Sequence, residues 1–200
     1  MTIIEKKFEI GGRQVTLQTG LLAKQARASV LADIDGTSVL VTLCTADITV
    51  DKGFLPFSVH YHERTYAYGS IPGGFKKREG PPSEREALTS RLIDRPLRPL
   101  FADHYLQEVQ IFAFLLSSNN EVQPDVVALI GAAAALELAR LPVLGTIGAV
   151  RIGCDEQDQW TVNPADKDTG KLDLVVAGTA DSIMMVEAKA QQIDESRMAE

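Results

Sequence analysis

Ser83-Glu-Arg-Glu-Ala-Leu-Thr-Ser-Arg-Leu-Ile-Asp-Arg-Pro96 is the stretch that places the first long helix in this sequence. Ser83 and Glu86 have the spacing of a capping box, in which each side chain accepts a hydrogen bond from the other residue's backbone. Proline lacks the N–H that a helix interior needs and disfavours helical backbone at the preceding residue. We therefore predict that the helix starts after Ser83 and stops or bends near Asp94 or Arg95.

Three arginines gather in and after this helix. Arg91 and Arg95 are four residues apart and share a helix face, and Arg98 follows three residues later. Guanidinium groups repel one another unless an anion lies between them, and arginine binds phosphate through a bidentate fork. Alternatively, each arginine pairs with a nearby carboxylate such as Asp94 or Glu108. The clustering favours a phosphate-facing site.

The preceding segment, residues 70–82, is rich in glycine and proline and has little apolar periodicity. Such a composition predicts a long exposed loop. Within it Phe75 is followed directly by Lys76, Lys77 and Arg78. An exposed ring beside cations suits single-stranded nucleic acid, because the ring stacks on a base while the cations meet phosphates. The alternative, that Phe75 packs into the core and the lysines only keep the loop soluble, is equally compatible with the sequence.

The charge distribution supports a localised anion site. The 200-residue chain has a net charge of −7, which argues against a protein that coats nucleic acid. Between Ile71 and Leu100, however, seven basic residues outnumber four acidic ones, which gives +3 and leaves −10 for the remainder. A basic island on an acidic protein indicates one anion-binding region. Ordinary solvated charge on a helix face is the alternative.

Outside this region the sequence alternates between apolar runs and turn residues. Gly11-Gly12 and Asp35-Gly36 are typical of hairpin turns. Strands are predicted at residues 8–10, 15–17, 28–34, 38–46, 54–62, 108–116, 147–152, 159–162, 172–177 and 183–188. An alanine-rich helix is predicted at residues 124–140, with apolar residues around most of its axis and Gly131 at a position of close packing. Strands with two substantial helices indicate an α+β fold.

Two histidines and two cysteines are the other residues with potential metal or thiol chemistry. His60 and His62 alternate on one strand and face the same side, but no third ligand is near, so a structural role is favoured over a metal site. Cys44 and Cys154 lie in separate apolar runs and are interpreted as two buried thiols. The sequence has no Walker or Rossmann glycine pattern, no signal peptide and no membrane-length apolar run, so a cytoplasmic protein is expected.

The loop and the arginine segment together resemble the signature of the bacterial polynucleotide phosphorylase family. The resemblance rests first on residues 70–101, which include Ile-Pro-Gly-Gly-Phe and Arg-Leu-Ile-Asp-Arg-Pro-Leu-Arg-Pro-Leu-Phe. Four further segments are similar to the same family: residues 130–133, 147–153, 163–164 and 172–179. The similarity runs from about Phe8 to the end of the chain.

This resemblance implies an RNase PH-like fold of mixed sheets packed with helices. Family members carry two such domains in tandem, followed by KH and oligonucleotide-binding-barrel domains, and three copies form a ring around an RNA pore. They degrade RNA from the 3′ end with inorganic phosphate and a divalent metal such as Mg²⁺, releasing nucleoside diphosphates, and the reaction is reversible. Residues 1–200 would be the first RNase PH-like domain, ending inside a helix that Asp194 caps. The second RNase PH-like domain and the KH and barrel domains would then lie outside this chain.

The resemblance also implies roles for particular residues. It places Phe75, Lys76, Lys77 and Arg78 at the pore, and Arg91, Arg95 and Arg98 near the active site of the second repeat. The second repeat holds Mg²⁺ and substrate with two acids and a lysine, where this chain has Lys167, Asp173 and Val175. Its hydroxyl-rich phosphate loop corresponds here to residues 123–128, which contain no hydroxyl. No catalytic or metal-binding residue is therefore expected in this chain, which alone should be inactive.

Two positions depart from the family pattern. Lys76 stands where a second aromatic residue is frequent, and Pro81 where an arginine is common. One ring fewer weakens base stacking, so RNA binding should depend more on charge and be more sensitive to salt.

Three functional hypotheses follow. The first is a subunit of a phosphorolytic 3′-to-5′ exoribonuclease, a homotrimer whose partners are single-stranded RNA, inorganic phosphate, nucleoside diphosphates and possibly an RNA-degradation complex. The second is a noncatalytic RNA-binding ring subunit of an exosome-like assembly. The third is an assembly domain that does not contact RNA.

Overall fold

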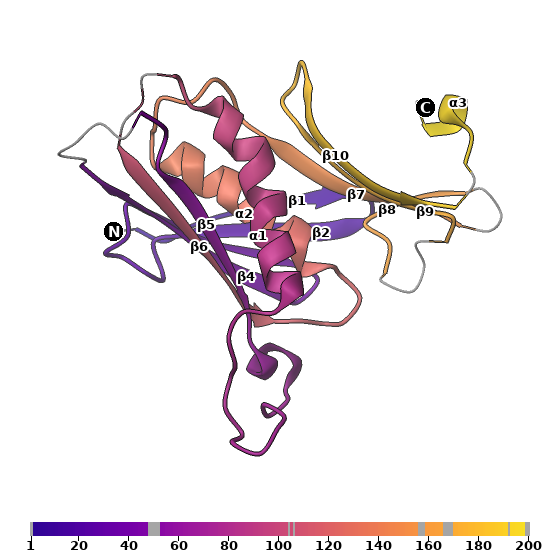
Figure 1. The fold of residues 1–200 in the computed structure, drawn as a ribbon, viewed down its shortest axis with the longest axis horizontal. Coiled ribbons are helices and arrows are strands. Elements are labelled where there is room, and N and C mark those ends of the chain that lie inside the picture. Colours follow the sequence, from indigo (N-terminus) through magenta and orange to yellow (C-terminus); the bar gives the residue numbers. More distant parts are fainter. Residues whose placement is uncertain are drawn as a thin grey trace.

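The computed structural model describes residues 2–47, 53–103, 105, 107–155, 159–165, 170–191 and 193–198. Two sheets and two long helices form the body (Figure 1). The large sheet contains, in spatial order, β1 (Ile4–Ile10), β2 (Arg13–Thr19), β3 (Ala28–Ile34), β4 (Thr37–Ala46), β6 (Glu108–Ser117) and β5 (Phe57–Glu63). The small sheet contains β10 (Ile183–Ala190), β9 (Leu172–Gly178), β7 (Gly148–Cys154) and β8 (Trp160–Val162).

The predicted α+β class is confirmed, and each predicted strand is present within a few residues. The two glycine-containing turns connect β1 with β2 and β3 with β4, and both hairpins are antiparallel. β5 pairs in parallel with β6 because the chain between them crosses over through a helix, α1 (Glu84–Leu97). That crossover places the predicted loop between the end of β5 and the start of α1.

Helix α2 (Pro124–Leu138) is the centre of the core. It packs on β3 and β4 of the large sheet and contacts β7 of the small sheet and helix α1. Its residues are buried on several sides, as the all-round apolar pattern predicted. Gly131 allows the close approach, because a Cβ there would lie 2.8 Å from Val41 Cγ2 and 3.2 Å from Ala32 Cβ.

Helix α1 begins as predicted but does not end as predicted. Both capping-box hydrogen bonds between Ser83 and Glu86 are present. The predicted stop near Asp94 or Arg95 is wrong, since α1 continues to Leu97 and runs into the short helix η2 (Arg98–Leu100). The alternative, a bend at Pro96, stays a prediction. Pro96 is buried in the last turn of α1, and the helix continues past it for one residue, Leu97, although proline cannot donate a backbone hydrogen bond.

Two smaller predictions concern cysteine and histidine. Cys154 is buried, but Cys44 is exposed, so the prediction of two buried thiols is wrong for Cys44. Cys44 directly follows the buried Leu43 in β4. Because successive side chains of a strand point to opposite faces, Cys44 lies on the face of the sheet that α2 does not cover. His60 and His62 do share one face, where they stack on Phe112 and Phe114 with ring centroids 4.9 and 5.1 Å apart.

The last helix, α3 (Glu195–Met198), begins directly after Asp194, where a helix was predicted. Within the described ranges no helix is long and apolar enough to span a membrane.

The close approach at Gly131 gives a stability prediction. Replacing Gly131 with valine should lower the free energy of unfolding by about 1–3 kcal/mol, because the added carbons must displace rigid neighbours in β3 and β4. Urea unfolding measures the change. Gly148→Ala is the control, since a Cβ at Gly148 meets nothing within 4 Å. Equal stability of both variants would contradict this packing.

Candidate functional site

The loop that follows η1 (Thr65–Tyr68) projects from the body beyond the start of α1 (Figure 1). Phe75 at its tip is fully exposed, at 102% of the reference accessibility. The alternative in which Phe75 packs into the core is therefore wrong. Lys76, Lys77 and Arg78 are exposed beside it. Within the described part of the chain none of these three takes part in an ion pair, so their charges face solvent.

The loop is held to the body on its returning side. The Glu79 carboxylate accepts hydrogen bonds from the Thr65 backbone N–H at 2.9 Å and from the Thr65 hydroxyl at 2.7 Å. These bonds lower the pKa of Glu79 below its ordinary value, so the contact is formed by the ionised carboxylate. Gly74 and Lys77 have positive φ values of 77° and 50°, which turn the backbone on either side of the tip. The bonds between Glu79 and Thr65 therefore fix the base of the loop, and the charged tip extends from that base.

Glu63, the last residue of β5, gathers polar side chains at the foot of the loop. It accepts hydrogen bonds from the hydroxyls of Tyr61 (3.0 Å) and Tyr68, and it lies 3.4 Å from Arg85 Nε. Burial, and then the nearby Glu63 charge, raise the pKa of Tyr61 well above its ordinary value. The tyrosine therefore stays a neutral donor, and the cluster fixes where the chain leaves the sheet.

Glu86 joins the end of β5 to the start of α1. Its side chain, buried with only 4% of the residue exposed, accepts from the backbone N–H groups of Glu63 (2.9 Å) and Ser83 (2.6 Å). Burial favours the neutral acid, but the hydrogen bonds from Glu63 and Ser83 outweigh it and lower the pKa of Glu86. His62 Nδ1 lies 3.9 Å from the same carboxylate, and burial, followed by the charge of Arg64, lowers the pKa of His62.

Arg98 is engaged within its own domain. Its guanidinium donates to both carboxylate oxygens of Asp94 at 3.0 and 2.6 Å, and to the Phe57 carbonyl at 2.9 Å. It also lies over the Phe57 ring, 5.3 Å from the centroid. The alternative of pairing with a nearby carboxylate therefore describes Arg98 in this structure, where the side chain ties η2 to the start of β5.

Arg95 and Arg91 differ from Arg98 and from each other. Arg95 Nη1 lies 2.9 Å from Glu187 of β10, and both side chains are 55% exposed, so this pair is solvent-screened and weak. The Arg91 side chain is exposed and makes no hydrogen bond or ion pair with any residue that the structure describes. Arg91 is therefore the arginine of the three that is available to an external anion without breaking an existing contact.

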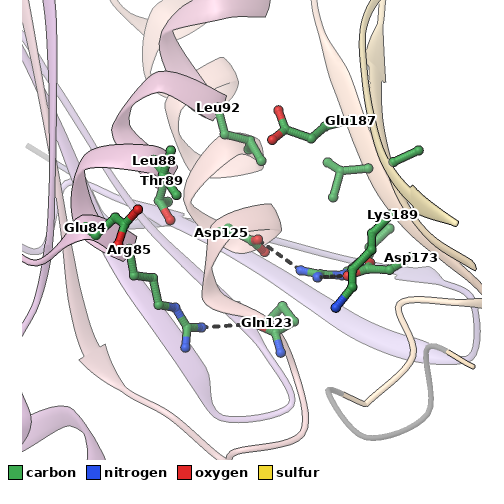
Figure 2. A pocket seen from close by; sticks show the side chains of 13 residues that line it. Glu84, Arg85, Leu88, Thr89, Leu92, Gln123, Asp125, Asp173, Glu187 and Lys189 are labelled. Carbon is green, nitrogen blue, oxygen red and sulfur yellow. Dashed lines mark hydrogen bonds and ion pairs between the residues drawn. The ribbon is translucent and has the colours of Figure 1, made fainter.

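A cleft of about 550 Å³ lies between α1 and β10, above the start of α2 (Figure 2). Its walls carry both apolar and charged side chains, and it is lined by Glu84, Arg85, Leu88, Thr89, Leu92, Gln123, Asp125, Arg151, Asp173, Val175, Glu187, Ala188 and Lys189. None of the three predicted arginines belongs to this lining. Arg85 Nη2 donates to Gln123 Oε1 at 3.0 Å across one end of the cleft.

The cleft floor is an ion-pair triad. Arg151 of β7 donates to Asp173 of β9 from Nε (2.6 Å) and Nη2 (2.5 Å), and to Asp125 at the start of α2 from Nη1 (3.0 Å). Burial raises the pKa of Asp125, and the positive charge of Arg151 opposes that shift. The triad links the small sheet to the central helix.

A family model described as 3′ exoribonuclease family, domain 1, matches residues 11–142. The chain belongs to the 3′ exoribonuclease family. Among solved structures, rice (Oryza sativa) Rrp46 superimposes with a TM-score of 0.69 over 99% of this chain and 84% of that chain. The sequence identity is 11%, so this likeness concerns the fold alone. Both comparisons agree with the RNase PH-like fold that the sequence predicted.

Three positions of this 3′ exoribonuclease domain correspond, by the resemblance, to the metal-binding residues of the second repeat. Two of them, Asp173 and Val175, line the cleft. Asp173 pairs with Arg151, and Val175 lines the cleft as an apolar side chain. Lys167 lies outside the described residues. The N-cap residue of α2 is Gln123, whose side chain makes no capping hydrogen bond. A serine or threonine hydroxyl at this position could have capped the helix.

Sequence reasoning missed Arg85, Arg151 and Asp125. Arg151 and Asp173 carried a usable signal, since each is a charge inside an otherwise apolar strand. Arg151 is directly opposite Val175 in the β7–β9 ladder, so Asp173, two residues away, is its diagonal neighbour on the same face. Arg85 and Asp125 carried no comparable signal because their contacts depend on how α1 and α2 cross.

The buried Glu86 carboxylate should make stability depend on pH. Its folded-state pKa is lowered, so its contribution is present above the unfolded value near about 4.3 and is lost as pH falls through the folded value. Glu86→Gln should cost about 1–3 kcal/mol at neutral pH and reduce the loss of stability on acidification. Urea unfolding at neutral pH and at about pH 3 measures both effects. Glu84→Gln, on the exposed first turn, is the control, and an unchanged pH dependence in Glu86→Gln would contradict this assignment.

Replacing Arg98 and replacing Arg91 should have different effects on the free energy of unfolding. Arg98→Ala should lower the free energy of unfolding by about 1 kcal/mol, because it removes bonds to Asp94 and to the Phe57 carbonyl. Arg91→Ala should change it by less than about 0.5 kcal/mol, because the side chain has no partner among the described residues. Thermal or urea unfolding of the two variants tests the difference. Equal effects would show that Arg98 is not a structural residue.

Proposed function

We propose that this chain is the RNA-guiding, noncatalytic RNase PH-like domain of a polynucleotide phosphorylase of the bacterial type. In this proposal the whole enzyme degrades single-stranded RNA from the 3′ end with inorganic phosphate and releases nucleoside diphosphates. A second RNase PH-like domain supplies the catalytic residues and holds Mg²⁺, KH and oligonucleotide-binding-barrel domains follow it, and three copies form the ring. Membership of the 3′ exoribonuclease family supports the reaction class.

The observation that carries the proposal is the loop tip. A fully exposed phenylalanine stands beside three cations that pair with no carboxylate in the described part of the chain, on a loop whose base is held by the Glu79 and Glu86 carboxylates. Exposing a ring to water is unfavourable, and a nucleobase would cover it by stacking. The adjacent Lys76, Lys77 and Arg78 would meet the phosphates on either side of that base. Single-stranded RNA satisfies both requirements with one ligand.

Arg91 gives a second contact point on the same ligand in this proposal. It is exposed on α1, the helix that the loop leads into, and its guanidinium is free of protein partners in the described residues. Arg95 would contribute by exchanging its exposed pair with Glu187 for a phosphate, at little cost because the pair is screened. Arg98 would act mainly by holding η2, since its donors are already used.

The cleft supports a noncatalytic role for this domain. Its two partly buried carboxylates, Asp125 and Asp173, are both paired with Arg151, and no hydroxyl stands at the start of α2 to bind phosphate. The same features fit the second candidate function, a noncatalytic RNA-binding subunit of an exosome-like ring. The two candidates share the RNA role of the loop and differ only in what the neighbouring domain does.

The RNA role is tested by removing the loop contacts together. Phe75→Ala with Lys77→Ala should weaken single-stranded RNA binding at least about fivefold, since stacking alone contributes about 1–3 kcal/mol per base. The slope of log K against log salt should fall by about 0.7, because one phosphate contact is lost. Fluorescence anisotropy with a labelled oligonucleotide over a salt series measures both quantities.

Phe8→Ala with Lys6→Ala is the matched control, because Phe8 is 42% exposed on β1, at the opposite edge of the large sheet from β5. This control should leave affinity and slope unchanged. Unchanged affinity and slope in the loop variant would exclude the RNA role and leave the assembly hypothesis. Release of nucleoside diphosphates from RNA by the 200-residue chain in phosphate would contradict the noncatalytic assignment.

A further inference from the structure

The foot of the loop, where it leaves η1, carries a second exposed ring that the RNA contacts proposed above do not include. Tyr66 of η1 is 54% exposed. The other three tyrosines of the chain each donate a hydrogen bond from the hydroxyl to a glutamate or glutamine side chain (Tyr61, Tyr68 and Tyr105). The Tyr66 hydroxyl makes no hydrogen bond to any residue that the structure describes, and its ring stacks on no other ring there. Tyr66 thus has no internal role that accounts for an aromatic side chain in water.

The backbone of η1 holds Tyr66 in a defined position. Gly69 ends this short helix in the left-handed conformation, with φ 66°, and its N–H donates to the Tyr66 carbonyl at 2.9 Å. The neighbouring Ala67 is buried, and its carbonyl accepts a hydrogen bond from the Ser118 N–H at 3.0 Å, which ties η1 to the chain directly after β6. Because this backbone is already ordered, a ligand that covers the ring would lose little affinity to the entropy of ordering it.

The closure of the loop brings a cation to the same place. The Glu79 carboxylate accepts hydrogen bonds from both the backbone N–H and the hydroxyl of Thr65. Tyr66 and Arg78 are the chain neighbours of these two bonded residues, so they lie on either side of one contact. Arg78 is exposed and forms no ion pair with a described residue. The foot of the loop therefore combines an exposed ring with an available cation, as Phe75 and the lysines after it do at the tip.

We propose that Tyr66 is a second stacking position for a nucleobase on the RNA path, with Arg78 contacting a phosphate beside it. This inference rests on the proposed function, because it takes single-stranded RNA as the ligand of the loop. A tyrosine ring stacks on any nucleobase, since every nucleobase has a π-face, and an adjacent cation binds the backbone of the same strand. One RNA strand therefore contacts the loop twice, through Phe75 at the tip and through Tyr66 at the foot.

The first test compares two substitutions of Tyr66 in fluorescence anisotropy with a labelled single-stranded oligouridylate. Tyr66→Ala should weaken binding at least about fivefold, whereas Tyr66→Phe, which keeps the ring, should stay within about twofold of the wild type. Phe54→Ala is the matched control, because Phe54 is 61% exposed and precedes β5, whereas the loop follows β5. This control should bind like the wild type. Unchanged affinity in Tyr66→Ala, or equal losses in Tyr66→Ala and Tyr66→Phe, would overturn the stacking role.

A second measurement detects the contact itself and does not depend on how Tyr66→Ala folds. Trp160 is the single tryptophan of the chain, so Tyr66→Trp combined with Trp160→Phe moves the only indole to the foot of the loop. A nucleobase stacked on that indole should quench its fluorescence as the oligouridylate is added. Unquenched emission at saturating oligouridylate would overturn the inference.

The loop-tip variant, Phe75→Ala with Lys77→Ala, separates this inference from the proposed function. If the loop-tip variant loses affinity and Tyr66→Ala does not, only the inference about Tyr66 fails. If Tyr66→Ala loses affinity and the loop-tip variant does not, the inference holds and the proposed role of the tip fails.

Discussion

The burial of helix α2 against β3 and β4 is the constraint on which the other features depend. The helix has no polar face, so it is stable only when covered by the large sheet, the small sheet and α1 together. Gly131 sets the distance, because a side chain there would collide with Val41 and Ala32. Once α2 is fixed, its first turn brings Asp125 to the cleft floor, and its flank gives α1 a surface to pack on.

Helix α1 and strand β5 are joined by carboxylates rather than by apolar contacts alone. Glu86 accepts hydrogen bonds from the last residue of β5 and from the cap of α1, and Glu79 ties the returning loop to η1. Each carboxylate accepts hydrogen bonds from backbone N–H groups at the end of a strand or helix, which would otherwise lack an acceptor within the protein. As a result the loop between them can carry an exposed ring and three cations without losing its position.

The basic residues of this region divide according to what they contact. Arg98 and Arg151 serve the protein itself, since their donors are used by carbonyls and carboxylates of the same domain. Lys76, Lys77, Arg78 and Arg91 have no such partners in the described part of the chain. Only this second group can contribute binding energy to an anion without an internal loss, which is why the proposed RNA path follows the loop and α1 rather than the cleft.

The sequence by itself determined the local elements and the exposed features. Hairpin turns, the capping box, the alanine-rich helix and the strand alternation are short-range signals, and the structure confirms them. It also located the charged loop, because glycine, proline and adjacent cations cannot pack into a core. It misjudged Pro96, which is buried inside the last turn of α1, and Cys44, which lies on the exposed face of β4.

Only the tertiary structure decided which charges are free. Arg95 meets Glu187 across 92 residues of sequence, and Arg151 meets Asp125 across 26, so neither pairing follows from spacing along one helix or strand. Phe75 could have been buried or exposed on the sequence alone, because a single ring in a loop has no periodicity. The same physical reason applies to Arg95, Arg151 and Phe75. The partners of a side chain depend on where other helices and strands cross its own element, and the packing of the whole core sets those crossing positions.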